Sequence, residues 1–205
     1  MKRRLLVPAG AALLVTLLVT AAAQQSGSTI PTGRIFEAIG VREGLTICEM
    51  GAGDGELSIA AAKAVGPSGR VYTSELGDAR VKTLRGRTAD SGLSQITVVE
   101  GDAVRTNFPD AACDALFMRN VYHHFADPAA INASIAAALK PGATIAVVDF
   151  TPPNKEADRA PDRAKDGMHG VMPDTVAREL TTAGLEVVRT EAGDDRWFLL
   201  VARRR

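Results

Sequence analysis

Three glycines at alternate positions stand out in the segment CEMGAGDGELS. Gly51, Gly53 and Gly55 follow a short apolar run and precede a sequence typical of a helix. Glycines at such a place allow a sharp turn and let a ligand approach main-chain N–H groups. The start of the following helix adds its positive end. The segment therefore predicts a binding loop for a small polar ligand.

Apolar and helical segments alternate from residue 45 onward. We expect strands at 45–50, 69–76, 96–102, 112–120, 144–150, 185–191 and 196–203, and helices at 33–41, 55–66, 78–92, 128–140 and 173–184. Strands that alternate with helices predict right-handed crossovers and a mainly parallel sheet. The last two strands are joined by a short turn, which predicts an antiparallel hairpin at the edge. The expected fold class is α/β.

Acidic residues end two of these strands, at Glu75 and Asp102. In an open α/β sheet, ligands bind beyond the carboxyl ends of the strands, where the glycines and both acids fall. A dinucleotide site of the type Gly-x-Gly-x-x-Gly needs a third glycine where this chain has Glu56. A carboxylate there would repel a pyrophosphate, so a ligand that carries positive charge fits better.

The passage TICEMGAGDG resembles the first motif of the class I S-adenosylmethionine-dependent methyltransferases, and LKPGATIAVVDF resembles their fifth-strand passage. The resemblance covers residues 33–205. It implies a Rossmann-like three-layer sandwich whose seven-stranded sheet is mostly parallel, with an antiparallel C-terminal hairpin strand, and S-adenosyl-L-methionine as cofactor. The residues that match the family's cofactor positions are Glu49, Gly51, Ala52, Gly53, Asp54, Gly55, Glu75, Leu76, Asp102, Ala103, Arg119 and Asn120.

Simpler roles also fit several of these residues. Glu49 fits a buried strand acid that only orders the loop, and Asp54 fits a cap of the following helix. Glu75 and Asp102 fit ordinary surface acids at strand ends. An acid at position 75 is equally expected in a dehydrogenase, so a dinucleotide-binding oxidoreductase stays open, although Glu56 opposes it.

The segment RNVYHHF follows the fourth strand, where the resemblance places the methyl acceptor. Tyr122, His123 and His124 are therefore the candidate catalytic residues, because a histidine near neutral pH can accept a proton. Packing against the helix beneath is the alternative role for this aromatic segment. His169 is a weaker candidate near the end of the Pro-rich segment 151–172, which we expect to act as a lid that selects the acceptor.

The spacing of histidine and cysteine residues is not typical of a metal site, so we expect no metal. The two cysteines, Cys48 and Cys113, lie in or beside apolar strands. In an exported protein, the alternative is a disulfide between these two cysteines. Buried free thiols are the preferred interpretation, because free cysteine commonly behaves as a small core residue.

Residues 1–23 have the three parts of a secretory signal: a basic start, an apolar stretch and Ala21-Ala22-Ala23 for cleavage. An uncleaved membrane anchor is the alternative, and either leads to a periplasmic or secreted domain. Residues 24–32 are predicted to be a linker and residues 33–205 the methyltransferase-like domain. Without the 3 basic residues of the signal, 21 basic side chains stand against 24 acidic ones, net −3.

This acidic balance argues against a nucleic-acid substrate. Val121 and Tyr122 also replace the two prolines that amino-directed nucleic-acid methyltransferases carry after the fourth strand. We therefore expect an exported enzyme that methylates a small molecule. The alternative is a methyltransferase-fold protein that binds an adenosine-like ligand without turnover. The oligomeric state is open, and membrane contact is expected only through an uncleaved anchor.

Overall fold

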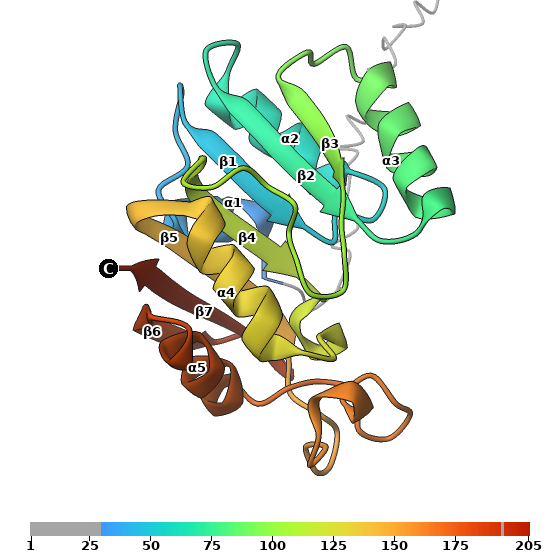
Figure 1. Cartoon of the computed structure of the whole chain (residues 1–205), viewed down its shortest axis with the longest axis vertical. Helices are drawn as coiled ribbons and strands as arrows, with labels where there is room; N and C mark the ends of the chain where they lie inside the picture. The colour runs from blue at the N-terminus through green and yellow to red at the C-terminus, as the bar shows by residue number, and fades with distance from the viewer. Residues whose placement is uncertain (1–29, 194) are drawn as a thin grey trace, which may run out of the picture.

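A seven-stranded sheet forms the centre of the computed structural model, which describes residues 30–193 and 195–205 (Figure 1). Its strands are β1 (Thr46–Met50), β2 (Arg70–Glu75), β3 (Ile96–Glu100), β4 (Cys113–Arg119), β5 (Leu139–Phe150), β6 (Leu185–Ala192) and β7 (Trp197–Arg204). They lie in the order β3-β2-β1-β4-β5-β7-β6. The first five strands pair in parallel, and β7 runs antiparallel to both β5 and β6.

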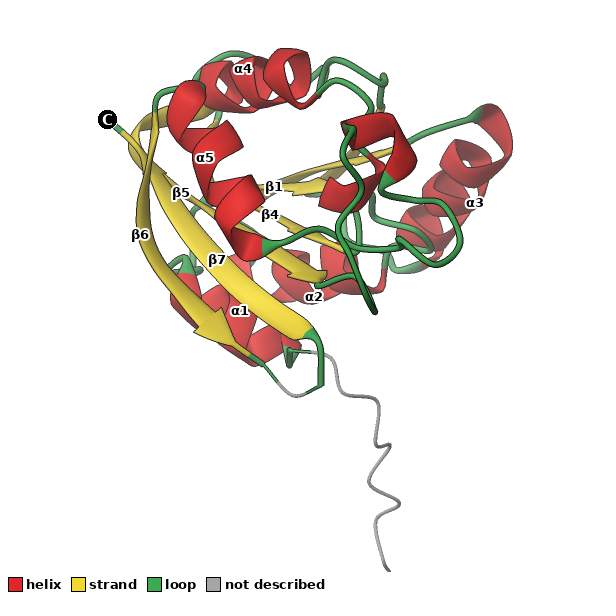
Figure 2. Ribbon diagram, turned by 90° about the horizontal axis from the view of Figure 1, so that it is seen from below, coloured by secondary structure: helices red, strands yellow, loops and turns green. Residues whose placement is uncertain are grey.

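Helices cover both faces of the sheet (Figure 2). They are α1 (Thr32–Ala38), α2 (Glu56–Val65), α3 (Asp78–Asp90), α4 (Pro128–Ala138) and α5 (Pro173–Thr182), with short 3-10 turns η1 (Tyr122–His124) and η2 (Ala160–Asp162). One core joins the sheet to α4 and α5, and a second joins its other face to α1 and α2. The structure thus has the three layers, the seven strands and the antiparallel hairpin that the sequence predicts.

Several element boundaries differ from the prediction by one to five residues. Helix α4 ends at Ala138 and β5 begins at Leu139, because residues 140–143 form an irregular start to the strand. Strand β3 ends at Glu100, which leaves Asp102 in the following loop. Residue Ile30 is already buried and α1 begins at Thr32, so the ordered domain starts inside the predicted linker.

The two cysteines form a disulfide, which corrects the prediction of free thiols. Cys48 lies on β1 and Cys113 begins β4, the adjacent strand, with their Cα atoms 5.7 Å apart. Both residues are fully buried. Apolar strand sequences cannot distinguish a buried thiol from a buried disulfide, because the pairing depends on which strands become neighbours.

The predicted signal and most of the predicted linker, residues 1–29, lie outside the described residues. Within the part of the chain that is described, every helix is too short or too polar to cross a bilayer.

The strand order reverses between β1 and β4, where β2 and β3 lie to one side and β5 to the other. Crossovers diverge at such a point and leave a crevice at the carboxyl ends of the strands. The glycine loop follows β1 and residues 120–126 follow β4, so the fold brings both segments to this crevice.

Candidate functional site

A cavity of about 330 Å³ opens at this crevice. Its lining comes from the ends of β1, β2 and β4 and from the loops that follow β3 and β4: Met50, Gly51, Ser74, Glu75, Leu76, Arg80, Gly101, Asp102, Ala103, Arg105, Asn120, Val121, His124, Phe125 and Ala126. This volume is at the lower end of the range for small-molecule sites. Six of the predicted cofactor residues are among the residues that line this cavity.

A second cavity of about 280 Å³ lies on the other side of the glycine loop. It is lined by Glu49, Gly51, Ala52, Gly53, Asp54, Glu56, Leu57, Arg119 and Asn120. Gly51 and Asn120 border both cavities, so the two cavities adjoin at the glycine loop. The two cavities together include every predicted cofactor residue except Gly55, which starts α2 in a left-handed conformation.

The backbone of the glycine loop explains two of its glycines. Gly51 has φ +67°, and a Cβ there would lie 2.3 Å from Cγ2 of Val121. Gly53 has φ +57° and open space around it, so its backbone is accessible from the cavity. Its N–H donates to a Glu75 carboxylate oxygen at 2.7 Å. These contacts require bare backbone where the loop meets β4 and β2.

Glu75 and Asp102 both face the first cavity from neighbouring strand ends. Glu75 is nearly buried, and it also accepts from the N–H of Leu76 at 2.9 Å. Asp102 is exposed, and one of its oxygens accepts from the N–H of Val104 at 2.8 Å. Each carboxylate keeps acceptor capacity for ligand hydroxyl or amino groups. Leu76 lies between them and is 42% exposed, which offers an apolar surface to a ring.

Glu49 lies beneath the loop and is 3% exposed. One of its oxygens accepts from the hydroxyl of Ser58 on α2 and lies 3.5 Å from that of Thr73 on β2. Burial raises the pKa of Glu49 from 4.5 to about 7, while Ser58 and the Arg119 guanidinium act in the opposite direction. Glu49 therefore ties β1 to α2 and β2, and it also borders the second cavity.

The remaining predicted cofactor residues lie at the rim. Asp54 is exposed, accepts from the N–H of Glu56 at 3.3 Å and so helps to cap α2. Arg119 ends β4 and lies 3.9 Å from a Glu56 carboxylate oxygen. Asn120 has φ +62°, and its N–H donates to the carbonyl of Val148 at 2.9 Å. This left-handed turn directs the chain from β4 into the cavity wall.

Seven further side chains line the first cavity without having been predicted, namely Met50, Ser74, Arg80, Arg105, Val121, Phe125 and Ala126. The guanidinium of Arg80 lies 3.7 Å from the Glu75 carboxylate. All of them except Arg80 lie one or two positions from a predicted residue. No local pattern in the sequence marks Arg80, because it reaches the cavity from the first turn of α3.

The three candidate catalytic residues separate within η1. His124 lines the first cavity. Tyr122 is fully buried, receives a hydrogen bond from Asn132 at 2.7 Å and donates one to Glu179 at 3.0 Å. Burial raises the pKa of its hydroxyl, so a role for Tyr122 as a base at the cavity does not fit this placement. His123 is 1% exposed and is not among the residues that line the cavity.

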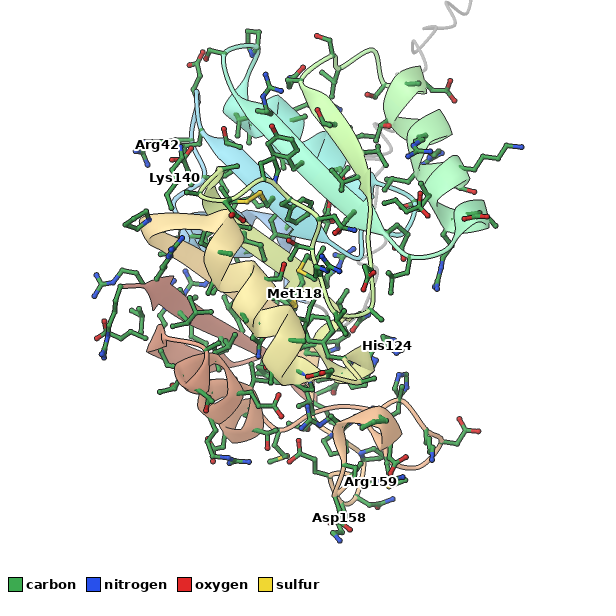
Figure 3. The ribbon with its side chains drawn as sticks, viewed as in Figure 1. Arg42, Met118, His124, Lys140, Asp158 and Arg159 are labelled. Carbon is green, nitrogen blue, oxygen red and sulfur yellow. A yellow bond between two sulfur atoms is a disulfide. The ribbon has the colours of Figure 1, made fainter. Side chains whose placement is uncertain are left out.

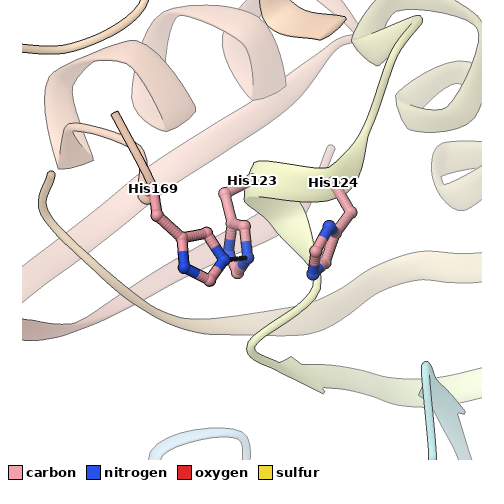
Figure 4. Close-up of side chains that lie close together, drawn as sticks. All are labelled: His123, His124 and His169. Carbon is pink, nitrogen blue, oxygen red and sulfur yellow. Dashed lines mark hydrogen bonds between the residues drawn. The ribbon is translucent and has the colours of Figure 1, made fainter. Parts of the chain in front are cut away.

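The chain's three histidines lie together although the sequence shows no metal-ligand spacing (Figure 4). Nε2 of His123 is 2.9 Å from Nε2 of His169, and the rings of His123 and His124 are 4.0 Å apart between centroids. Figure 3 shows His124 beyond the end of β4, next to the segment 151–172 that carries His169. The adjacent pair and the third histidine are 45 positions apart, which hides the cluster in the sequence.

Comparison with known families adds the chemistry that this geometry serves. Residues 48–147, which include the glycine loop and β1 to β5 up to Val147, match the family described as a methyltransferase domain. Residues 48–147 thus have the sequence of a methyltransferase domain. This match confirms the methyltransferase resemblance drawn from TICEMGAGDG and supports S-adenosylmethionine, the methyl donor predicted from it.

Curated relatives also match part of the chain. The ubiquinone/menaquinone biosynthesis C-methyltransferase UbiE of Pseudomonas putida is 35% identical over 133 residues, which are 62% of this chain and 50% of the relative. UbiE of Pseudomonas fluorescens is 34% identical over 123 residues, 58% of this chain and 46% of the relative. The chain thus spans about half the length of the curated relatives it matches.

Solved structures confirm the fold. A S-adenosylmethionine-dependent methyltransferase from Aquifex aeolicus superposes with a TM-score of 0.74 at 22% identity, over 87% of this chain and 92% of that one. The [4+2]-cyclase SpnF reaches the same TM-score at 17% identity, over 84% and 80%. The likeness to a cyclase shows that this fold alone does not fix the reaction.

Proposed function

We propose that this protein is a methyltransferase that transfers a methyl group from S-adenosylmethionine to a small-molecule acceptor outside the cytoplasm. The observation that carries the proposal is the pair of cavities joined at Gly51 and Asn120, with Glu75 and Asp102 along one and Glu49 beneath the other. S-adenosylmethionine would supply a methyl group already activated by its sulfonium.

The described residues fit that cofactor by their chemistry. Glu75 and Asp102 offer carboxylate acceptors to ribose hydroxyls and to the adenine amino group. Exposed Leu76 offers the apolar surface for the ring. On the other side of the loop, Glu49, Asp54 and Glu56 surround the second cavity with carboxylates that favour an ammonium or a sulfonium. A pyrophosphate would meet the same carboxylates, which disfavours the dinucleotide alternative.

The acceptor would approach from the side of η1. His124 is the candidate base that lines the cavity, and burial lowers its pKa below the ordinary value, with His123 and His169 acting in the same direction. A neutral imidazole at this wall can accept the proton that an oxygen or nitrogen acceptor loses. The segment 151–172 borders this side, so we assign acceptor choice to it. The curated relatives' names favour a quinone-type acceptor as the first class to test.

Export rests on two features. Residues 1–23 have the composition of a secretory signal, and the buried disulfide Cys48–Cys113 is of a kind that persists in oxidising compartments. The cofactor is made inside cells, so an exported enzyme needs a supply of it or acts before export. A reporter fused to the chain tests export. If its activity is found only in the cytoplasm, export is refuted, and the proposed reaction is not affected.

Calorimetry with S-adenosylmethionine, S-adenosylhomocysteine and NAD tests the ligand, and a tritiated-methyl transfer assay over phenols, hydroquinones and small amines tests the reaction. We expect both adenosyl ligands to bind, NAD not to bind, and one acceptor class to be labelled. Binding of NAD alone would overturn the proposal. Binding of S-adenosylhomocysteine with no labelled acceptor would favour the alternative, a non-catalytic protein that binds an adenosine-like ligand.

A further inference from the structure

The histidine cluster has the composition of a metal site. His123, His124 and His169 are all the histidines of the chain, and one ring nitrogen of each lies within 4.8 Å of the others. Two segments supply them: η1, directly after β4, and the end of the polar segment before α5. Imidazole nitrogens are good ligands for Zn²⁺ and related divalent ions, and three histidines form a known type of zinc site.

Asp149 fixes which nitrogen of His123 is free. One oxygen of the fully buried Asp149 lies 2.8 Å from Nδ1 of His123. Its other oxygen accepts a hydrogen bond from the main-chain N–H of His123 at 3.1 Å. A carboxylate has no proton to give, so Nδ1 is the donor and Nε2 carries the lone pair. That lone pair points at His169, 2.9 Å away (Figure 4).

A carboxylate behind a histidine is the usual outer partner of a metal ligand. It orients the ring and makes the ligating nitrogen more basic. Here Asp149 also accepts from the N–H of Phe150 at 2.8 Å, so its position is set by the end of β5. The arrangement Asp149–His123 with a second imidazole at the free nitrogen is an observation separate from the clustering itself.

We propose that His123, His124 and His169 bind one divalent transition-metal ion, with Zn²⁺ as the ion that best fits three neutral imidazoles. Four ligands around Zn²⁺ at about 2.0–2.1 Å stand roughly 3.3 Å apart from one another. The 2.9 Å between His123 and His169 needs a slight opening, and His124 needs to move closer. His124 and His169 are the residues that need to move, and both have exposed side chains that can adjust.

No free thiolate competes for the ion in the described part of the chain. The two cysteines are joined to each other, which removes thiolates as competing ligands.

Three protein ligands leave a fourth position for water or substrate, as in catalytic zinc sites. His124 lines the first cavity, so that position opens toward the acceptor side. This consequence rests on the proposed function: an acceptor hydroxyl bound there would have its pKa lowered by the ion. Metal binding would then replace the role of His124 as a base, because one lone pair cannot serve both.

The test measures Zn²⁺ binding by the full chain, purified without a polyhistidine tag, stripped with a chelator and titrated against a chromophoric competitor. We expect one equivalent of Zn²⁺ per chain. His124→Ala and His169→Ala should each weaken binding by more than the roughly 10- to 100-fold that loss of an outer partner costs. Asp149→Asn should weaken Zn²⁺ binding by roughly 10- to 100-fold, the cost of losing an outer partner.

Asp158→Asn is the matched control, since Asp158 is an exposed carboxylate of the same polar segment, at its outer tip in Figure 3. Its Zn²⁺ affinity should equal that of the unmodified chain. Far-UV circular dichroism checks that each variant folds. Absence of stoichiometric binding, or binding that His124→Ala and His169→Ala leave unchanged, overturns the proposal. No adenosyl ligand enters this titration, so its result is independent of methyl transfer.

Discussion

Asp102 holds an exposed carboxylate at the rim of the first cavity, with one oxygen fixed by the N–H of Val104. We predict that Asp102→Ala weakens the binding of S-adenosylhomocysteine by the worth of a charge-assisted hydrogen bond, about 1.5–3 kcal/mol. Calorimetry measures this directly, with Asp158→Ala as a carboxylate removed far from the cavity. Equal affinities for Asp102→Ala and the unmodified chain would remove Asp102 from the site.

Glu49 makes stability depend on pH. Its pKa is raised from 4.5 to about 7 by burial, so the folded chain keeps a proton that the unfolded chain has lost between these two values. The free energy of unfolding should therefore fall as pH rises from 4.5 through 7, by on the order of 3 kcal/mol from this group. Glu49→Gln should flatten that part of the curve.

Urea unfolding at several pH values compares the two proteins. Other groups titrate in both, so the difference between the curves isolates Glu49. A cationic ligand reverses the preference, because it stabilises the ionised carboxylate, so the affinity for S-adenosylmethionine should rise with pH in the unmodified chain more than in Glu49→Gln. Parallel curves for the two proteins would contradict the assignment.

The acids and glycines of the site could be predicted because each lies at a strand end, where sequence order alone fixes the position. The neighbours Tyr122 and His124 could not be separated in the same way. Both lie in one 3-10 turn, and the direction of each side chain depends on how that turn leaves β4. His169 reaches its partners through tertiary folding of the segment 151–172, so no local spacing announces the cluster.

At the scale of elements, an ion pair fastens the segment 151–172 to α5. Arg163 is 6% exposed and donates to both carboxylate oxygens of Glu179, at 2.6 and 3.2 Å. The hydroxyl of Tyr122 donates to the same carboxylate. The polar segment that carries His169 is therefore held to the helix layer through a shared, mostly buried network.

We predict that Glu179→Ala lowers the free energy of unfolding by about 3 kcal/mol, because it leaves the buried Arg163 charge without its partner. Breaking a buried ion pair costs roughly 3–5 kcal/mol, and the lower value applies here because Glu179 stays partly exposed. Chemical denaturation measures the loss, and limited proteolysis shows whether cleavage concentrates in 151–172. Glu186→Ala, which removes an exposed partner of Arg203, is the control and should change stability little.

At the scale of the whole molecule, the disulfide closes a loop of 65 residues that contains the glycine loop, β2 and β3. We predict that replacing both cysteines, Cys48→Ala with Cys113→Ala, costs about 2–4 kcal/mol of stability. Thermal unfolding of the two proteins without reductant measures the difference.

The control is the unmodified chain with a reductant under native conditions. Both sulfurs are buried, so reduction should be slow until the protein unfolds. Rapid reduction of the folded chain, or equal melting temperatures for the two proteins, would contradict a structural role for the bond.

The position of β7 between β5 and β6 has a consequence for biosynthesis. Strand β6 emerges from the ribosome before β7, yet its neighbour in the finished sheet is β7. Until β7 arrives, β6 has nothing to pair with and the outer edge of β5 keeps open backbone groups, which invite pairing with other chains. A nascent chain of this kind benefits from a chaperone that shields that edge during translation.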